Sequence, residues 1–194
     1  GYILKSDSPS CGMERVRIYG KSGIPVKSGR GLFAAQLMKA YPLLPVEEEG
    51  RLNDAKLREN FIVRVFAYHR FVELTLGKWT VGDLVAFHTF QKYLLLAHSP
   101  KHYDELGRLV AGAATIPRSA LQESYGLLLM EALSVKTTTK KNVNVLQHIL
   151  GFLKDKLTAP EKEDILAVID EYQRELVPLV VPLTLLRHYV KNHD

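Results

Sequence analysis

The stretch that decides the fold reads RENFIVRVFAYHRF at positions 58–71 and, after a short break, VGDLVAFHTFQKYLLLAHSPKHYDELGRLVAGA at positions 81–113. Apolar residues recur in it three and four positions apart, which is the period of an amphipathic helix. Gly77 is a helix stop between the first two segments, and Ser99 with Pro100 is a typical helix start. The stretch therefore predicts three consecutive helices on which basic and aromatic side chains alternate.

The same helical period continues to the end of the chain. Two of the expected helix starts are capping boxes, formed by Thr80 with Asp83 and by Thr158 with Glu161. The expected helices cover residues 53–76, 80–97, from 99 onward, 117–135, 141–157, 158–176 and a last one up to 192. This part of the chain therefore predicts an all-α bundle of about six or seven helices.

The N-terminal part has a different pattern. Two short strands, a loop and a helix are expected at residues 2–5, 15–19, 20–31 and 31–40. Because a few extended residues cannot form a stable sheet alone, we expect the chain to be a fragment of a longer protein. The fold class is mainly all-α, and the expected organisation is a short α/β remnant at 1–42, a linker at 43–52 and a helical domain at 53–194.

Composition narrows the class of protein. With 194 residues, 46% of them apolar, the chain can bury one core with a smaller appendage. Its net charge of +5 permits binding to nucleic acid or other anions without requiring it. The single cysteine, Cys11, excludes an internal disulfide and agrees with a reducing compartment. No apolar run is long enough to cross a bilayer, so we expect a cytoplasmic protein that does not bind membranes.

Several polar side chains interrupt the apolar pattern of their helices. Arg64 falls on the apolar stripe that contains Tyr68, so its charge must be paired, bind an anion or reach water. It predicts either a structural ion pair or a ligand contact. His88 and Lys92 lie one turn apart on an otherwise apolar helix. That pair indicates either a polar stripe facing a cleft or a buried hydrogen-bond network.

The start of the third helix is a candidate anion site. His98 and Ser99 precede a helix whose free N-terminus would favour a phosphate. His98 and His102 also have the spacing of two metal ligands, but the glutamate of the zinc-protease motif is missing, and a metal site is not favoured.

A further polar face is expected near residue 148. Asn144, His148 and Gly151 share one side of a helix, with Lys154 as the nearby charge. A glycine in the middle of a helix is unfavourable by about 1 kcal/mol relative to alanine. Its presence therefore indicates close approach of another element or, alternatively, of a ligand.

Taken together, these motifs resemble the YbgA-like domain. The segments that carry the resemblance are RENFI at 58–62, YHR at 68–70, KYLLLAHS at 92–99, YDELG from Tyr103 to Gly107 and NVLQHILGF at 144–152. They span most of residues 53–194. That family is a domain of unknown function, so the resemblance implies membership of a family without supplying a reaction.

Upstream, the segment ILKSDSPSCG at residues 3–12 resembles the last part of the TudS-like thiouracil desulfidases, a domain commonly fused ahead of a YbgA-like domain. In that family three cysteine thiolates hold a 4Fe-4S cluster that takes the sulfur from a thiolated base. The resemblance implies that Cys11 is the last of those ligands. The other two cysteines are absent, so we expect no cluster on this chain alone and an upstream desulfidase domain as its partner.

These observations predict a non-catalytic accessory domain that binds a nucleobase- or phosphate-bearing substrate, which can be a free base, a nucleotide or a nucleic acid such as RNA. The expected lining consists of Arg64, Tyr68, His88, Lys92, His98, Ser99, Tyr103, Asn144, His148 and Lys154. Basic groups would neutralise phosphate, and aromatic rings would stack on bases. Two alternatives remain open: a structural module that forms a homodimer, and a self-sufficient enzyme with His88 or His148 as general base.

Overall fold

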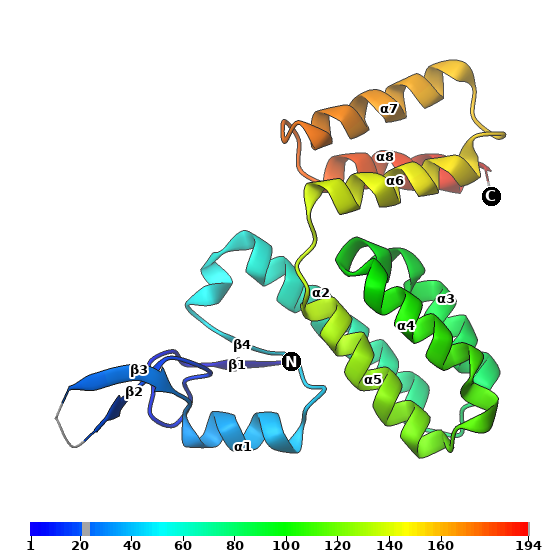
Figure 1. The fold of residues 1–194 in the computed structure, drawn as a ribbon. Helices are drawn as coiled ribbons and strands as arrows, with labels where there is room; N and C mark the ends of the chain where they lie inside the picture. Colours follow the sequence, from blue (N-terminus) through cyan, green and yellow to red (C-terminus); the bar gives the residue numbers. More distant parts are fainter. Residues whose placement is uncertain (21–23, 194) are drawn as a thin grey trace.

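The protein is described by a computed structural model that covers residues 1–20 and 24–193. Figure 1 shows three parts in chain order: a small α/β part at the N-terminus, a four-helix part and a three-helix part at the C-terminus. Each part has its own cluster of buried apolar side chains. None of the helices within the described residues is long and apolar enough to cross a membrane.

The N-terminal part holds two small sheets and one helix. Its elements are β1 (Tyr2–Leu4), β2 (Val16–Tyr19), β3 (Pro25–Gly29), α1 (Leu32–Ala40), β4 (Val46–Glu48) and the short 3-10 helix η1 (Arg51–Asn53). β1 pairs with β4 in parallel, and β2 pairs with β3 antiparallel. Leu4, Ala34 and Val46 are buried together and form its small core.

Two of these strands differ from the sequence-based expectation. β3 lies in the segment 20–31 that was expected to be a loop, and β4 with the first two residues of η1 lies in the expected linker 43–52. The acidic run that suggested a linker is largely internal, since Glu47 and Glu48 are buried. Arg51 Nε donates to Glu47 Oε1 at 2.7 Å, and the Met13 amide donates to Glu48 Oε1 at 2.7 Å. Arg51 is only four residues from Glu47, whereas Met13 is distant in the sequence, and both partners make the burial of these carboxylates favourable.

The four-helix part contains the largest core. Its helices are α2 (Ala55–Thr75), α3 (Val81–His98), α4 (Pro100–Ala111) and α5 (Arg118–Ser134), with a 3-10 turn η2 (Ala113–Thr115). Phe71 stacks on Tyr125 at a centroid distance of 5.8 Å, and Phe87 packs against both. The Thr80–Asp83 capping box and the Ser99 cap are confirmed, whereas Asp54, and not Asn53, caps α2.

The three-helix part consists of α6 (Thr139–Leu153), α7 (Ala159–Gln173) and α8 (Val180–His193). The capping box of Thr158 and Glu161 starts α7 as expected. Leu146, Ile165 and Leu186 belong to a core separate from that of the four-helix part. α6 packs against α3, so the two helical parts meet along these helices. The mainly all-α fold class is confirmed, but the helices form two adjoining bundles instead of one.

Candidate ligand-binding site

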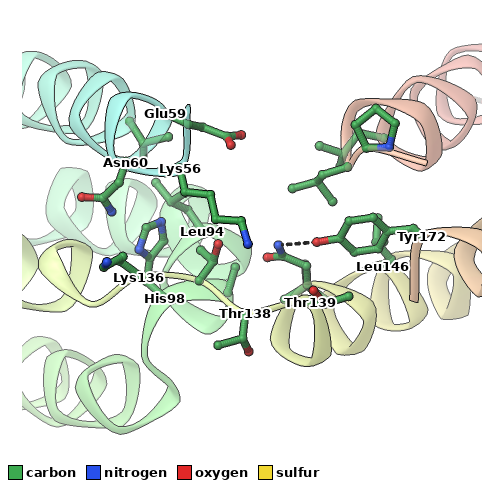
Figure 2. Close-up of a pocket in the computed structure, with 18 of the residues that line it drawn as sticks. Lys56, Glu59, Asn60, Leu94, His98, Lys136, Thr138, Thr139, Leu146 and Tyr172 are labelled. Carbon is green, nitrogen blue, oxygen red and sulfur yellow. Dashed lines mark hydrogen bonds between the residues drawn. The ribbon is translucent and has the colours of Figure 1, made fainter. Parts of the chain in front are cut away.

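A cavity of about 930 Å³ lies where the four-helix and three-helix parts meet (Figure 2). Its walls come from the start of α2, the end of α3, the connection 136–138, α6, and the segment from the end of α7 into α8. This volume is in the range of cavities that enclose small molecules. The cavity therefore exists because two separate cores meet without filling the space between them.

Part of the cavity lining is polar. The polar lining side chains are Lys56, Glu59, Asn60, Tyr93, His98, Lys136, Thr137, Thr138, Thr139, Asn142, Tyr172 and Glu175. In Figure 2, Lys56 from α2 and Tyr172 from α7 point into the cavity from opposite sides. The charged members are two lysines and two glutamates, so the charges of the lining balance.

The rest of the cavity lining is largely apolar. Its lining side chains include Leu94, Val145, Leu146, Ile149, Leu176, Val177, Leu179 and Leu183. Such a surface favours a flat or aliphatic group over a hydrated one, because contact removes apolar area from water. A molecule with one apolar face and several polar edges is therefore the best match to the whole cavity.

His98 is the polar residue whose state the structure defines best. Its Nδ1 lies 2.6 Å from the carbonyl oxygen of Val135. A carbonyl oxygen only accepts, so Nδ1 carries the hydrogen and, in the neutral ring, Nε2 is an acceptor. Burial lowers the pKa of His98, and the nearby charges of Lys141 and Arg64 lower it further, although the hydrogen bond to Val135 acts in the opposite direction. His98 is therefore a neutral acceptor at pH 7.

Hydrogen bonds hold the cavity walls in place. Asn142 Nδ2 donates to Tyr172 Oη at 2.8 Å, and both side chains are buried. Thr139 Oγ1 donates to Glu175 Oε1 at 3.2 Å, which ties α6 to the end of α7 a second time. Lys141 Nζ donates to the carbonyl oxygen of His98 at 2.6 Å and joins α6 to α3. The cavity is thus preformed by contacts between its own walls.

Of the ten residues expected to line a site, only His98 lines this cavity. Arg64 instead faces the N-terminal part, where its Nη2 lies 3.6 Å from Glu47 Oε2. Burial lowers the pKa of Arg64, while the charge of Glu47 raises it. This geometry matches the structural ion pair that was one of the two expectations for Arg64. Tyr68 packs against the core of the four-helix part.

His88 lies inside the four-helix core. Its ring stacks on Tyr103 at 5.2 Å, and its Nδ1 lies 3.2 Å from Tyr125 Oη. Burial lowers the pKa of His88 and raises that of Tyr125. The arrangement matches the buried hydrogen-bond network that was the alternative to a cleft-facing stripe. Lys92 is half-buried on the same helix, with its Nζ 5.7 Å from the centre of the Tyr93 ring.

The remaining expected residues lie elsewhere. Ser99 is buried and caps α4 with its own side chain, which accepts from the His102 amide at 3.4 Å. Asn144, His148 and Gly151 line a separate shallow depression on α6. A Cβ added at Gly151 would meet nothing within 4 Å, so the expectation that this glycine permits close packing was wrong. Lys154 is exposed just beyond the last turn of α6.

Most of the lining was missed because it comes from segments that carry no motif. The run KTTTKKN at 136–142 suggested only a helix start, yet it supplies five lining residues. One local signal was available. Asn142 stands beside Val143, Val145 and Leu146, and a polar side chain at the start of such an apolar face is expected to have a specific partner.

Cys11 is half-buried in the loop between β1 and β2, and its amide donates to Ser8 Oγ at 3.1 Å. The described residues contain no group of three or more His, Cys, Asp or Glu side chains that could hold a metal ion. One thiolate supplies one ligand, so these residues do not make up the ligand set of an iron-sulfur cluster. The role of Cys11 as the last ligand stays a prediction.

The buried histidines predict a dependence of stability on pH. Below its ordinary pKa of 6.5, His98 binds a proton in the unfolded chain before it does so in the folded protein. The free energy of unfolding should therefore fall as the pH drops below 6.5, by up to about 1.4 kcal/mol over one pH unit. Burial lowers the pKa of His88 in the same direction. Urea denaturation at several pH values measures the slope, and an equal slope in His98→Asn would contradict the assignment.

The C-terminal part of the protein, from α2 to α8, is an all-helical domain with a cavity between its two bundles. Residues 92–194 match the family model described as "Protein of unknown function (DUF1722)". Because the match covers more than half of the chain, the protein belongs to this family.

The N-terminal part matches a second family. Residues 1–49 match the family model of 2-thiouracil desulfurase. A similar protein is "Uncharacterized protein YbgA" of Escherichia coli (strain K12), which is 29% identical over 140 residues, or 72% of this chain and 83% of that protein. No solved structure matches the chain significantly. The expected resemblances to a YbgA-like domain and to a thiouracil desulfidase are therefore confirmed.

Proposed function

We propose that the helical domain is a non-catalytic accessory module that binds a nucleobase- or phosphate-bearing small molecule in the junction cavity. It would act beside an iron-sulfur desulfurase domain that removes sulfur from a thiouracil-type base. The match of residues 1–49 to 2-thiouracil desulfurase supports this association. The lone Cys11 supports a cytoplasmic location.

The observation that carries the proposal is the mixed lining of the cavity. Leu94 and Leu146 supply apolar surface to it, while His98, Asn142 and Tyr172 supply polar groups. A nucleobase combines the same two properties, since its faces are apolar and its edges carry donors and acceptors. A volume of about 930 Å³ leaves room for a base with an attached sugar.

Binding is a better account than catalysis. The described lining contains no serine or cysteine side chain, and the His98 ring is hydrogen-bonded to the Val135 carbonyl and to none of the threonine, glutamate or lysine side chains of the lining. His98 Nδ1 donates to a backbone carbonyl, whereas the base of a catalytic triad is oriented by a carboxylate. Of the two expected general bases, His88 is buried against Tyr103 and Tyr125, and His148 lies in the separate depression on α6. The lining is thus suited to hold a ligand.

A structural module that forms a homodimer is the second candidate. Phe66 on α2, Phe90 on α3 and Phe152 on α6 are exposed, and large exposed aromatic side chains are typical of contact surfaces. Light scattering of the purified chain would reveal a dimer. A dimer that binds none of the small molecules tested below would favour this candidate.

The proposal predicts that filling the cavity abolishes binding. Ala97 lines the cavity from α3, so the ring of Ala97→Phe should occupy the space of the ligand. Isothermal titration of the 194-residue chain with uracil, 2-thiouracil, uridine and uridine monophosphate should show binding that this variant weakens at least about tenfold. Ala111→Phe, on the exposed side of α4, is the matched control and should bind as the parent does. Absence of binding to all four compounds would refute the proposal.

A further inference from the structure

We propose that the cavity selects an uncharged heterocycle with a ring N–H, such as a free pyrimidine base or its nucleoside, and that His98 Nε2 accepts that N–H. This inference rests on the proposed function. It narrows the proposed ligand from any nucleobase- or phosphate-bearing molecule to an uncharged one, and it explains this preference by the charges of the lining residues and by His98.

The charges around the cavity argue against a phosphate. Lys56 and Lys136 are offset by Glu59 and Glu175, so the lining has no net positive charge to neutralise a dianion. Glu175 is held in place by Thr139, which donates to its carboxylate. A phosphate in the cavity would lose hydration and lie near fixed carboxylates, which disfavours it. An uncharged ligand avoids both effects.

At the start of α6 the helix cap already takes up one of the amides that an anion would use. Thr138 lines the cavity, but its Oγ1 accepts from the amide of Lys141 at 3.3 Å and caps the helix. The Asn142 amide donates to the Thr138 carbonyl at 3.0 Å, as in an ordinary first turn. A phosphate would have to displace the Thr138 side chain before it could accept a hydrogen bond from the Lys141 amide.

His98 supplies what an uncharged heterocycle requires. Because Nδ1 donates to Val135, Nε2 is the ring atom that remains for a ligand, and it can only accept while the ring is neutral. Burial and the nearby positive charges of Lys141 and Arg64 lower the pKa of His98, which keeps the ring neutral. A protonated ring would repel an N–H group, whereas the neutral ring receives it.

The apolar wall next to His98 provides a surface for the face of the heterocycle. Leu94 lies one turn before His98 on α3, and both residues line the cavity. Leu146 on α6 belongs to the same lining. A planar ring between these leucines would have its edge toward His98 and toward the Asn142–Tyr172 pair. The hydrogen bond to His98 would then orient a ring that the leucines hold by apolar contact.

Two substitutions of His98 separate its two ring nitrogens. The amide of His98→Asn can take the place of Nδ1, so it keeps the donor to Val135 but removes the acceptor that faces the ligand. His98→Gln places its amide near the position of Nε2 and keeps a polar group there. A loss of binding in the asparagine variant that the glutamine variant partly restores is therefore expected only if Nε2 contacts the ligand.

The test is isothermal titration of the full chain and both variants with uracil, uridine, uridine monophosphate and 1,3-dimethyluracil, which has no ring N–H. The parent should bind uracil and uridine at least about tenfold more tightly than the monophosphate and the dimethyl compound. His98→Asn should bind uracil about tenfold more weakly and should no longer distinguish it from dimethyluracil. Thermal unfolding followed by circular dichroism establishes that each variant is folded.

The outcomes separate this inference from the proposed function. If uracil binds, Ala97→Phe blocks it, and dimethyluracil binds equally well, the cavity is a ligand site but His98 does not select the N–H. If the monophosphate or a labelled tRNA binds more tightly than uridine, the inference about charge is overturned. If none of the compounds binds, the proposed function itself fails.

Discussion

Replacing Glu47 with glutamine should lower the free energy of unfolding by about 3 kcal/mol, because it leaves the half-buried charge of Arg64 without its counterion. The Glu47 carboxylate is buried and lies 2.7 Å from Arg51 Nε and 3.6 Å from Arg64 Nη2. The Glu47 carboxylate matters most for Arg64, because Arg64 Nε is buried without a hydrogen-bond partner and the charge of the guanidinium is offset mainly by this carboxylate. Urea denaturation of the parent and the variant measures the difference.

A double-mutant cycle isolates the ion pair. Arg64→Met should lower the free energy of unfolding in the parent and also in the Glu47→Gln variant. The loss should be smaller in the variant by about 1 kcal/mol or more, because the charge of Arg64 is already unpaired there. Asp170→Asn is the matched control. Its partner Arg174 lies 3.5 Å away on the exposed side of α7, and such a pair contributes about 0.5 kcal/mol at most. Additive effects of the Glu47 and Arg64 substitutions would show that the two side chains do not interact.

Gly126→Ala should destabilise the protein by about 2 kcal/mol, although alanine is the better helix former. A Cβ at this buried position of α5 would lie 2.8 Å from both Leu43 Cδ1 and Phe71 Cε1. Phe71 is itself buried and stacked on Tyr125, so its ring cannot give way freely. Urea denaturation again provides the measurement.

Gly151→Ala is the control for this substitution. It makes the same chemical change in α6, where nothing lies within 4 Å of the new Cβ. The free energy of unfolding should rise by about 0.5 kcal/mol, since only the helix propensity changes. Equal effects of the two substitutions would mean that α5 does not approach Phe71 as closely as described.

The helices could be predicted because their signals are local. The capping boxes at Thr80 and Thr158 and the cap at Ser99 each lie within four residues of the helix start they define. β4 could not be predicted in this way. It depends on pairing with β1, more than forty residues earlier, and on Arg64 and the Met13 amide, which make its buried carboxylates favourable.

The candidate site was largely beyond local reasoning. The cavity exists only where two bundles meet, and the residues of α2, α3 and α7 that line it are separated by long stretches of chain. The residue types that commonly bind ligands pointed to His88 and Arg64. In the structure, however, His88 contacts Tyr103 and Tyr125, and Arg64 pairs with Glu47. His98 was found because its position next to a helix start is visible in the sequence. Lys56, Lys136 and Tyr172 showed no such signal.

Chemical-shift mapping with uracil tests the central claim most directly, because it locates a ligand residue by residue. In a titration of the 15N-labelled chain, amide shifts should concentrate at cavity residues such as Ala97, Thr138 and Val177. The amides of His148 and Gly151, in the separate depression on α6, should change little. Shifts centred on that depression, or no shifts at all with saturating uracil, would contradict a ligand site between the two bundles.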